Sequence, residues 1–600
     1  MKKGLKILAL SLALVMTLVA CGGKNNDAKK ETGGNGSATG AETTSFGTVA
    51  DHGGEAIENG VVRIGVVADS PFTGVFSNYF NQVVTDQILT GYITQSMKIK
   101  ADGDIRDEDE FHTFKFDQEK KQFIMTIKDT FKWSDGTPVT SRDFAFVYEI
   151  VGHPDYSGVR YDSKMQNIVG MEEYHNGEAE TISGVETPDD KTLIVNFKEF
   201  SPSILWGAGI AYTPEPYHYL KDIPVKEMAS HDKIRINPLS CGPYVITKVV
   251  PGEKVEYKRN EHYGAEVKNE GLVAEIISSA NVLSAMKNGK YDLYTSIPGN
   301  IKNQDLASLE GYTTLQYPSN SFLGIGFKLG KWNAEKNEVE VDPNAKMADV
   351  NLRKAMAYAL DIDAICDMFY EGLRQHANST IIPKNVSFYD PNAEMYDYNP
   401  EKAKEILDEA GYKDVDGDGL REDPNGEKLT INYAAMSGGE TAEPVATAYV
   451  QWWNEIGLDV QLLDGRLHEF NSFYERVQAD DPDIDVYLVS WGYGTNPDPS
   501  ETYSKYAPFN LPRYTDEKIE EALAHITSNE AFDRDYMVEG YRMFDKAIFD
   551  SVPVIPTMFV EEREVVNKRV KFYDVTPSTN EKLNDFGIKD IELTADKPAK

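Results

Sequence analysis

Short apolar runs and their spacing predict strands and helices along most of the chain. Residues 61–68, 123–127 and 192–197 are apolar runs bounded by polar turns, which is typical of strands. Asp189-Asp190-Lys191 is predicted to form the hairpin connection into the last of them.

Helical and strand patterns alternate in the second half of the chain. Asn399-Pro400 predicts a helix start, because Asn is a good N-cap and Pro suits the first helical position, and Gly411 ends that helix. The pattern predicts a further helix and two strands, at residues 443–456, 458–462 and 484–489. Helices that alternate with strands over short loops indicate an α/β lobe with a mixed or parallel sheet.

The N-terminus has the pattern of a secretion signal. Lys2, Lys3 and Lys6 precede an uncharged run over residues 7–20. The run is shorter than the roughly 20 apolar residues of a membrane span, and it is typical of a signal peptide. Leu18-Val19-Ala20-Cys21 resembles the bacterial lipoprotein signal, in which Cys21 is lipidated. An ordinary signal peptide with an incidental cysteine is the alternative.

Residues 21–60 are polar and rich in glycine, and they predict a lipidated, flexible tether. Such a segment has too little apolar surface to offset the entropy of ordering. No later run approaches the roughly 18 apolar residues of a spanning helix. We therefore expect a body from about Val61 that is anchored to a membrane rather than spanning it.

Composition and charge narrow the classes of function. The chain has 600 residues, 41% of them hydrophobic, and a net charge of −36. This charge excludes a nucleic-acid partner, because phosphate contacts need clustered Lys and Arg, and it disfavours docking of the body on anionic lipid. Three cysteines, Cys21, Cys241 and Cys366, are too few for a zinc module or a disulfide scaffold. Cys241 and Cys366 either pair or stay two buried thiols.

A series of motifs follows in order along the body. Residues 123–148 combine a strand, Trp133 before a tight Ser134-Asp135-Gly136 turn, and a helix start near Asp143. The later motifs are Cys241-Gly242-Pro243-Tyr244, Pro251-Gly252, Arg259-Asn260 with Tyr263, Met286 to Asp292, Arg353-Lys354-Ala355 with Ala359-Leu360-Asp361, Glu401 to Tyr412, Ser490-Trp491-Gly492 and Asp498-Pro499. Together they resemble the extracellular solute-binding proteins of the oligopeptide/dipeptide/nickel class.

The resemblance implies an α/β, two-lobed periplasmic-binding-protein-like fold with an additional domain inserted in the first lobe. It places a signal peptide at 1–20, the tether at 21–60, lobe I at 61–95, 215–315 and 555–600, the inserted subdomain at 96–214 and lobe II at 316–554. The motif around Trp133 then falls in the inserted subdomain, where we expect it to support structure.

The function that the resemblance implies is capture of oligopeptides outside the cell and delivery to an ATP-driven membrane permease. The protein is then a monomer, not an enzyme, and needs no cofactor. The alternatives are a binding protein for nickel, haem or an oligosaccharide, and a receptor for pheromone peptides. A secreted hydrolase is less favoured, because no nucleophile with a base and an orienting acid is recognisable.

The ligand loop is predicted after the strand that precedes Trp491. Ends of such strands border crevices, glycines allow close backbone approach, and Trp and Tyr offer apolar area with a polar handle. A structural turn with a core Trp is the alternative. The candidate ligand-binding residues are Trp491, Gly492, Tyr493, Gly494, Thr495, Asn496 and Asp498.

One position departs from the family pattern. Related proteins that hold a free peptide N-terminus often carry an aspartate three residues after this Trp, and here that position is Gly494. The nearest acid, Asp498, belongs either to the site or to a structural Asp-Pro pair. Longer peptides, modified peptides and other solutes therefore stay open as ligands.

The remaining candidate chemistry is weak. Asp414, Asp416 and Asp418 with Gly419 have the first spacings of a calcium loop, but the twelfth position is Asn425 rather than Glu. An Asx-rich turn is therefore favoured. Residues 284–287 match S-x-x-K without the partner motifs of that enzyme class. The histidines form no convincing metal-like cluster, and no Walker A sequence is present.

We predict that Cys21→Ser leaves the body able to bind ligand but releases it from the membrane. A lipid chain contributes about 0.8 kcal/mol per buried CH₂, and the acidic body offers no substitute for it. Fractionation of cells that express each form checks this. A variant that remains in the membrane fraction after a salt wash would contradict the lipoprotein hypothesis.

Overall fold

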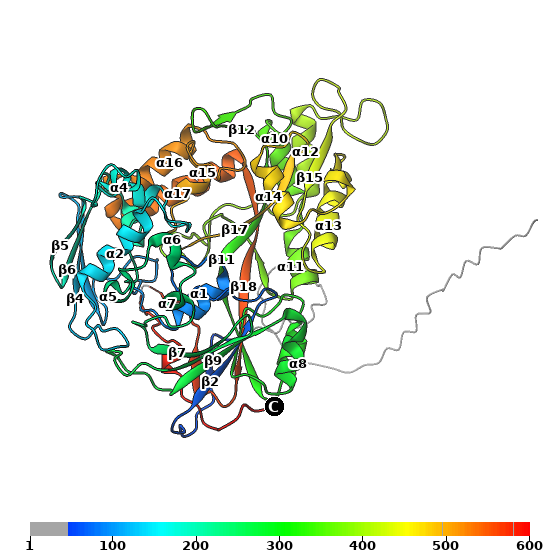
Figure 1. Cartoon of the computed structure of the whole chain (residues 1–600). Helices are drawn as coiled ribbons and strands as arrows, with labels where there is room; N and C mark the ends of the chain where they lie inside the picture. Colours follow the sequence, from blue (N-terminus) through cyan, green and yellow to red (C-terminus); the bar gives the residue numbers. More distant parts are fainter. Residues whose placement is uncertain (1–45, 495, 580) are drawn as a thin grey trace, which may run out of the picture. The chain divides into compact units, whose positions relative to one another are not determined.

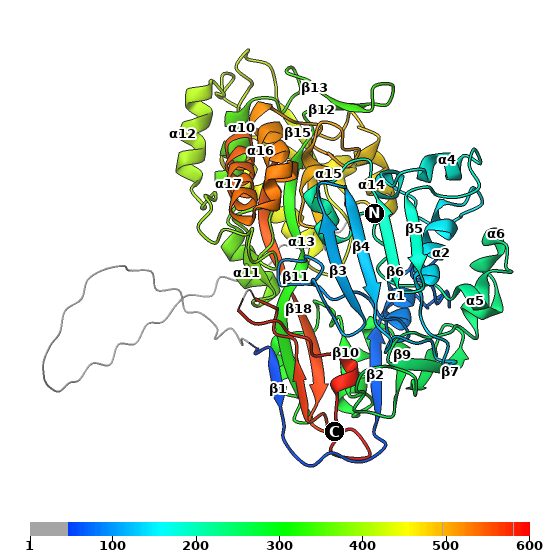
Figure 2. The same ribbon diagram turned by 90° about the vertical axis from the view of Figure 1, so that its left-hand side faces the viewer.

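A computed structural model describes residues 46–494, 496–579 and 581–600 (Figures 1 and 2). The predicted signal peptide, Cys21 and the first part of the tether lie outside the described residues. No helix in the described part of the chain has the length and apolar character needed to cross a membrane.

Two long antiparallel strands, β11 (Tyr312–Phe327) and β18 (Val554–Asn567), lie at the centre of an eleven-stranded sheet (Figure 1). The order of the sheet is β16 (Asp459–Leu462), β15 (Thr430–Ala434), β17 (Val486–Gly492), β11, β18, β10 (Leu293–Thr295), β2 (Val61–Val67), β9 (Gly271–Ile277), β8 (Lys254–Arg259) and β7 (Tyr244–Val250), with β14 (Arg374–His376) paired to β18.

The register of the two long strands shifts halfway along them. Residues 312–318 pair with residues 567–561, residues 322–326 pair with residues 559–554, and the ladder is irregular between Pro318 and Phe322. Such an irregularity bends the strands and increases their twist. β10 and β2 continue the sheet on the first half, and β17 and β15 continue it on the second. The central sheet therefore has two parts, which share only this bent pair of strands.

A second, four-stranded sheet lies within residues 96–214. Its order is β3 (His112–Asp117), β4 (Gln122–Ile127), β6 (Thr192–Asn196) and β5 (Val185–Asp189). Helix α2 (Ser141–Gly152) packs against it and begins with a capping box between Thr140 and Asp143. Trp133 is buried in the hydrophobic core of this unit. The Trp133 motif therefore supports the structure of this four-stranded unit. The limits of the inserted subdomain and of the two lobes stay a prediction.

Several predicted elements are confirmed. The strands predicted near residues 61, 123, 192 and 458 correspond to β2, β4, β6 and β16. Helix α12 (Pro400–Ala410) follows Asn399, whose Oδ1 accepts from the Lys402 backbone N–H at 2.9 Å, and it ends at Gly411 with φ of 94°. β15 runs parallel to β16 and β17, whereas β11 is antiparallel to β17, so the predicted mixed sheet is present.

The remaining bounds complete the framework. The other helices of eight or more described residues are α1 (Val84–Gly91), α10 (Val350–Tyr358), α11 (Ile362–Tyr370), α13 (Ala442–Glu455), α14 (Phe470–Gln478), α16 (Glu517–Thr527) and α17 (Arg534–Ser551). Two pairs of strands lie outside the larger sheets: β1 (Val49–Asp51) with β19 (Phe572–Asp574), and β12 (Gly330–Asn333) with β13 (Glu338–Val341).

The predicted tether extends too far. Residues 46–60 were assigned to it, but Val49–Asp51 form β1 and Ala50 is buried. A three-residue strand is too short to give a period in the sequence, and its pairing with residues 572–574 depends on the tertiary fold. The folded body therefore includes residues before Val61.

The two cysteines of the body do not pair. Cys241 and Cys366 are both free and buried, and they belong to different hydrophobic cores. Desolvation raises the pKa of each thiol to about 12. Of the two alternatives for these cysteines, two buried thiols is the correct one.

A buried ion pair ties the end of β18 to β10 and β2. The Asp292 carboxylate lies 2.6 Å from Nη2 of Arg569 and also accepts from the Arg63 backbone N–H at 2.8 Å. Asp292 and Arg569 are 0% and 4% exposed. A buried ion is costly when its partner is removed, so this pair holds three chain segments in one arrangement.

We predict that Asp292→Asn lowers the free energy of unfolding by about 3–5 kcal/mol, because it leaves the buried Arg569 guanidinium without a counter-ion. Urea unfolding of the variant and the wild type measures the change. Asp222→Asn is the matched control, since Asp222 is exposed and makes no ion pair within the described residues. Equal effects of the two substitutions would contradict a structural role for the pair.

Candidate functional site

A cavity of about 680 Å³ lies between the segment from Trp491 to Thr502, which begins at the end of β17, and residues 96–212. A volume of this size suits a small-molecule or peptide ligand. One wall is formed by Trp491, Gly492, Tyr493, Gly494, Asn496, Asp498, Glu501 and Thr502. The opposite wall includes Met97, Ile105, Arg160, Lys164, Trp206 and Tyr212. The predicted loop residues therefore share one cavity, except Thr495, which lies outside the described residues.

Tyr493 anchors the loop to the protein. Its backbone N–H donates to the Asn320 carbonyl at 2.8 Å, and its hydroxyl donates to the Thr380 carbonyl at 2.9 Å. Its ring stacks on Phe322, with the ring centroids 6.0 Å apart. Burial raises the pKa of Tyr493 well above its usual value. Tyr493 is thus chiefly a structural support of the loop, although its edge reaches the cavity.

Trp491 is the large aromatic side chain that the cavity wall presents. It is the last residue but one of β17, where it pairs with Phe322, so the strand extends further than predicted. The side chain is half-buried and packs against Phe509 at a centroid distance of 5.9 Å. A core tryptophan would be fully buried, so the position of Trp491 agrees with a residue at a cavity surface.

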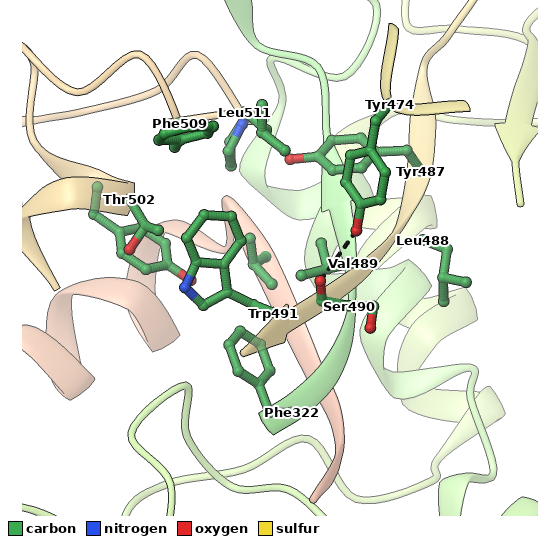
Figure 3. A pocket seen from close by; sticks show the side chains of 13 residues that line it. Phe322, Tyr474, Tyr487, Leu488, Val489, Ser490, Trp491, Thr502, Phe509 and Leu511 are labelled. Atoms are coloured by element: carbon green, nitrogen blue, oxygen red, sulfur yellow. Dashed lines mark hydrogen bonds between the residues drawn. The ribbon is translucent and has the colours of Figure 1, made fainter. Parts of the chain in front are cut away.

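A small apolar pocket of about 30 Å³ (Figure 3) shares Trp491 and Thr502 with the lining of the large cavity. Its other walls include Phe322, Val489 and Leu511. Figure 3 shows the indole of Trp491 between Phe322 and Phe509. Tyr474 closes another side, where its hydroxyl donates to the Ser490 carbonyl at 3.1 Å.

Gly492 and Gly494 leave the backbone of the loop uncovered. A Cβ atom placed on either glycine would meet no heavy atom within 4 Å. Packing within the protein therefore does not require glycine here. The empty space beside both residues is space that a ligand main chain can occupy.

Asn496 and Asp498 form the turn into α15 (Ser500–Tyr503). Oδ1 of Asn496 accepts from the Asp498 backbone N–H at 3.0 Å, and Oδ1 of Asp498 accepts from the Ser500 backbone N–H at 2.9 Å. Desolvation raises the pKa of Asp498. Asp498 therefore has the structural role proposed for the Asp-Pro pair, and its side chain also lines the cavity.

Ion pairs and aromatic pairs connect residues 96–212 to residues between positions 388 and 534. Nζ of Lys164, in the short helix α3 (Ser163–Gln166), lies 2.7 Å from Oε1 of Glu501. Arg534 lies 3.2 Å from the Asp102 carboxylate and also contacts Asp104. Phe200 stacks on Phe532, and Trp206 packs against Phe388. The partly exposed Lys164–Glu501 pair contributes about 0–1 kcal/mol and an aromatic pair about 0.5–1.5 kcal/mol, so these contacts are individually weak enough to open and close.

No cavity residue between positions 96 and 214 was predicted from the sequence. Arg160, Lys164, Trp206 and Tyr212 come from different elements that have no common spacing. They approach the ligand loop only because the four-stranded unit packs beside it. The one signal in the sequence that could have pointed to this wall is a cationic residue next to an aromatic one, Arg160 beside Tyr161.

The calcium-like loop does not belong to this cavity. Asp414, Asp416 and Glu422 have metal-like spacing among the described residues. Their carboxylates are already engaged, however. Asp414 accepts from the Gly417 backbone N–H at 2.6 Å, Asp416 lies 3.5 Å from Lys428, and Glu422 accepts from the Val415 backbone N–H. These contacts agree with the favoured Asx-rich turn.

A fold with two strand groups joined by a bent pair, and a cavity between walls from distant segments, is the architecture of a binding protein that encloses its ligand. Residues 113–511 match the model of the bacterial extracellular solute-binding proteins, family 5 Middle. The chain belongs to this family.

Individual relatives agree. The chain is 33% identical to the oligopeptide-binding protein OppA of Lactococcus lactis subsp. lactis over 490 residues, which cover 80% of this chain and 81% of the relative. The structure of lactococcal OppA with an endogenous peptide in the closed conformation matches with a TM-score of 0.73 and 29% identity, over 89% of this chain and all of that one. The oligopeptide-binding protein AppA from Bacillus subtilis in complex with a nonapeptide matches with a TM-score of 0.65 and 18% identity, over 90% of this chain and all of that one. The predicted α/β, two-lobed fold is confirmed.

We predict that Tyr493→Phe lowers the free energy of unfolding by about 1–3 kcal/mol, because it leaves the buried Thr380 carbonyl without its donor. Denaturant unfolding measures the difference. Tyr506→Phe serves as the control, since Tyr506 is 66% exposed. A Tyr493→Phe protein as stable as the control would show that the hydroxyl does not anchor the loop.

Proposed function

We propose that this protein captures oligopeptides outside the cytoplasm and delivers them to an ATP-driven membrane permease. The observation that carries the proposal is the cavity between the loop from Trp491 to Thr502 and residues 96–212. It occurs in a chain of the family-5 solute-binding proteins whose relative OppA is described as an oligopeptide-binding protein.

The geometry of the cavity suits an extended peptide. The open space beside Gly492 and Gly494 lets a ligand main chain approach the loop closely. Main-chain pairing there would give affinity that does not depend on the ligand's side chains. Trp491, Trp206 and Tyr212 supply apolar surface for its side chains. Enclosure between the two walls removes water, and the polar contacts that remain become stronger.

Closure follows from the same contacts. The two walls meet through individually weak pairs such as Lys164–Glu501, and the lobes share the bent strands β11 and β18. A ligand that touches both walls adds binding energy only to the closed arrangement, and it therefore shifts the population toward that arrangement.

The other ligands receive less support. A nickel site needs a cluster of donors, and the acidic group with metal-like spacing among the described residues does not line the cavity. Nothing in the cavity favours haem or an oligosaccharide over a peptide. A receptor for pheromone peptides would bind its ligand by the same chemistry. It would differ from a nutritional peptide-binding protein in its partner and not in this site. The family is one of solute-binding proteins, which favours binding over hydrolysis.

Attachment completes the proposal. Lipidation of Cys21 would hold the protein at the outer face of the cell membrane as a monomer, close to its permease. The lipoprotein-like residues before Cys21 support this step.

Mass spectrometry of ligands released from the purified full chain tests the proposal. We expect a mixture of oligopeptides. Release of a metal complex, haem or sugar without peptides would overturn it, as would cleavage of added peptides by the purified protein.

We predict that Trp491→Ala weakens binding of the co-purified peptides by about 1–3 kcal/mol through loss of apolar contact. Calorimetric titration with one of those peptides, synthesised, measures the loss, and thermal melting measures stability in parallel. Trp332→Ala is the matched control, because Trp332 is also partly exposed but lies in β12, outside the cavity. A Trp491→Ala variant that loses stability but keeps its affinity would place Trp491 in the core and not in the site.

A further inference from the structure

The charged groups of the cavity are divided between its walls. Arg160 and Lys164 line the wall that belongs to residues 96–212, and Asp498 and Glu501 line the wall after β17. Lys164 is paired with Glu501 at 2.7 Å. Asp498 is engaged by the Ser500 backbone N–H. Three of the four charged groups thus have partners within the protein.

Arg160 is the exception. Within the part of the chain that the structure describes, its guanidinium has no carboxylate within ion-pair distance. Its Nε lies 3.4 Å from the Asn78 carbonyl, which is long for a hydrogen bond. A guanidinium has five N–H donors, so most of the donors of Arg160 remain available.

The backbone holds Arg160 in place. Tyr156 donates to the Tyr79 carbonyl on one side, and Asp162 caps α3 on the other by accepting from the Lys164 and Met165 backbone N–H groups at 3.0 and 3.1 Å. Between them, a Cβ on Gly158 would lie 2.7 Å from the Tyr79 carbonyl oxygen, so only glycine permits this approach. These contacts hold the chain on both sides of Arg160.

Arg160 is partly exposed at the cavity wall, and an arginine with open donors there has a definite chemical complement. The planar fork of a guanidinium matches a carboxylate through two parallel N–H···O bonds, and such charge-assisted bonds are stronger than bonds between neutral groups. Glu501 is paired with Lys164, and Asp498 accepts from the Ser500 backbone N–H. Neither acid lies within ion-pair distance of Arg160, so a ligand can supply the carboxylate.

We propose that Arg160 binds a carboxylate of the bound peptide and thereby makes this protein prefer peptides that carry one at that position. The carboxylate belongs either to the peptide C-terminus or to an Asp or Glu side chain. This inference rests on the proposed capture of oligopeptides and names the class of peptide that the cavity selects.

Retention of a defined peptide pool tests it. Nonapeptides of random sequence are prepared with either a free C-terminal carboxyl or a C-terminal amide, and each pool is made with and without Asp and Glu. The purified full chain is incubated with the four pools mixed in equal amounts, and the retained peptides are quantified by mass spectrometry.

The wild type should retain carboxylate-bearing peptides over those without any carboxylate by about tenfold, as expected for a charge-assisted bond. Arg160→Gln should lose this preference while it still retains the neutral peptides, because the backbone and aromatic contacts remain. Arg466→Gln is the matched control, since Arg466 is exposed, lies outside the cavity and makes no ion pair within the described residues.

The pools also identify the source of the carboxylate. A preference that follows the free C-terminus assigns Arg160 to the peptide end, and one that follows Asp and Glu assigns it to a side chain. Retention of all pools equally by the wild type, or an unchanged preference in Arg160→Gln, overturns this inference and leaves the proposed function standing. Retention of no peptide by the wild type overturns the proposed function itself, and this inference with it.

Discussion

The main-chain hydrogen bonds between β11 and β18 are the constraint on which the rest of the structure depends. These strands are the meeting point of the two parts of the central sheet, and each extends through both. A ladder of this length resists shearing, so the irregularity between Pro318 and Phe322 is where the proposed closure would bend the sheet. β17 is paired to the second half of β11, and the ligand loop therefore moves with that half. The wall from residues 96–212 belongs to a unit outside this ladder.

Buried arginines reinforce the framework on either side of the bend. Arg353 donates to the carbonyls of Met347, Ser551 and Val552 at 2.6–3.0 Å, and desolvation lowers its pKa to about 10. Arg563 donates to the carbonyls of Ile301 and Pro298 at 2.8 and 2.9 Å. Carbonyl oxygens that surround a guanidinium offset much of its desolvation. These carbonyls occupy donors of Arg353 and Arg563, whereas Arg160 in the cavity keeps donors for a ligand.

The motifs that identify the family have mainly structural roles. Trp133 packs in the core beside the four-stranded sheet, Asp292 pairs with Arg569, and Arg353 joins α10 to the end of α17. Trp491 is both a structural residue and a cavity residue, since it is part of the β17 ladder and also lines the cavity. Because the scaffold residues are separate from most of the cavity wall, ligand preference can change among relatives while the fold persists.

The sequence alone determined the local elements and one wall of the site. The sequence predicts features that depend on neighbours in the chain. They are the periods of the strands and helices, the Asn399 cap and the position of the Trp491 loop. The family resemblance supplied the two-lobed fold. Only the tertiary structure decided that Ala50 joins the body, that Tyr493 is an anchor, and that Arg160 faces the ligand loop. These contacts join residues more than a hundred positions apart, and no local period records such a distance.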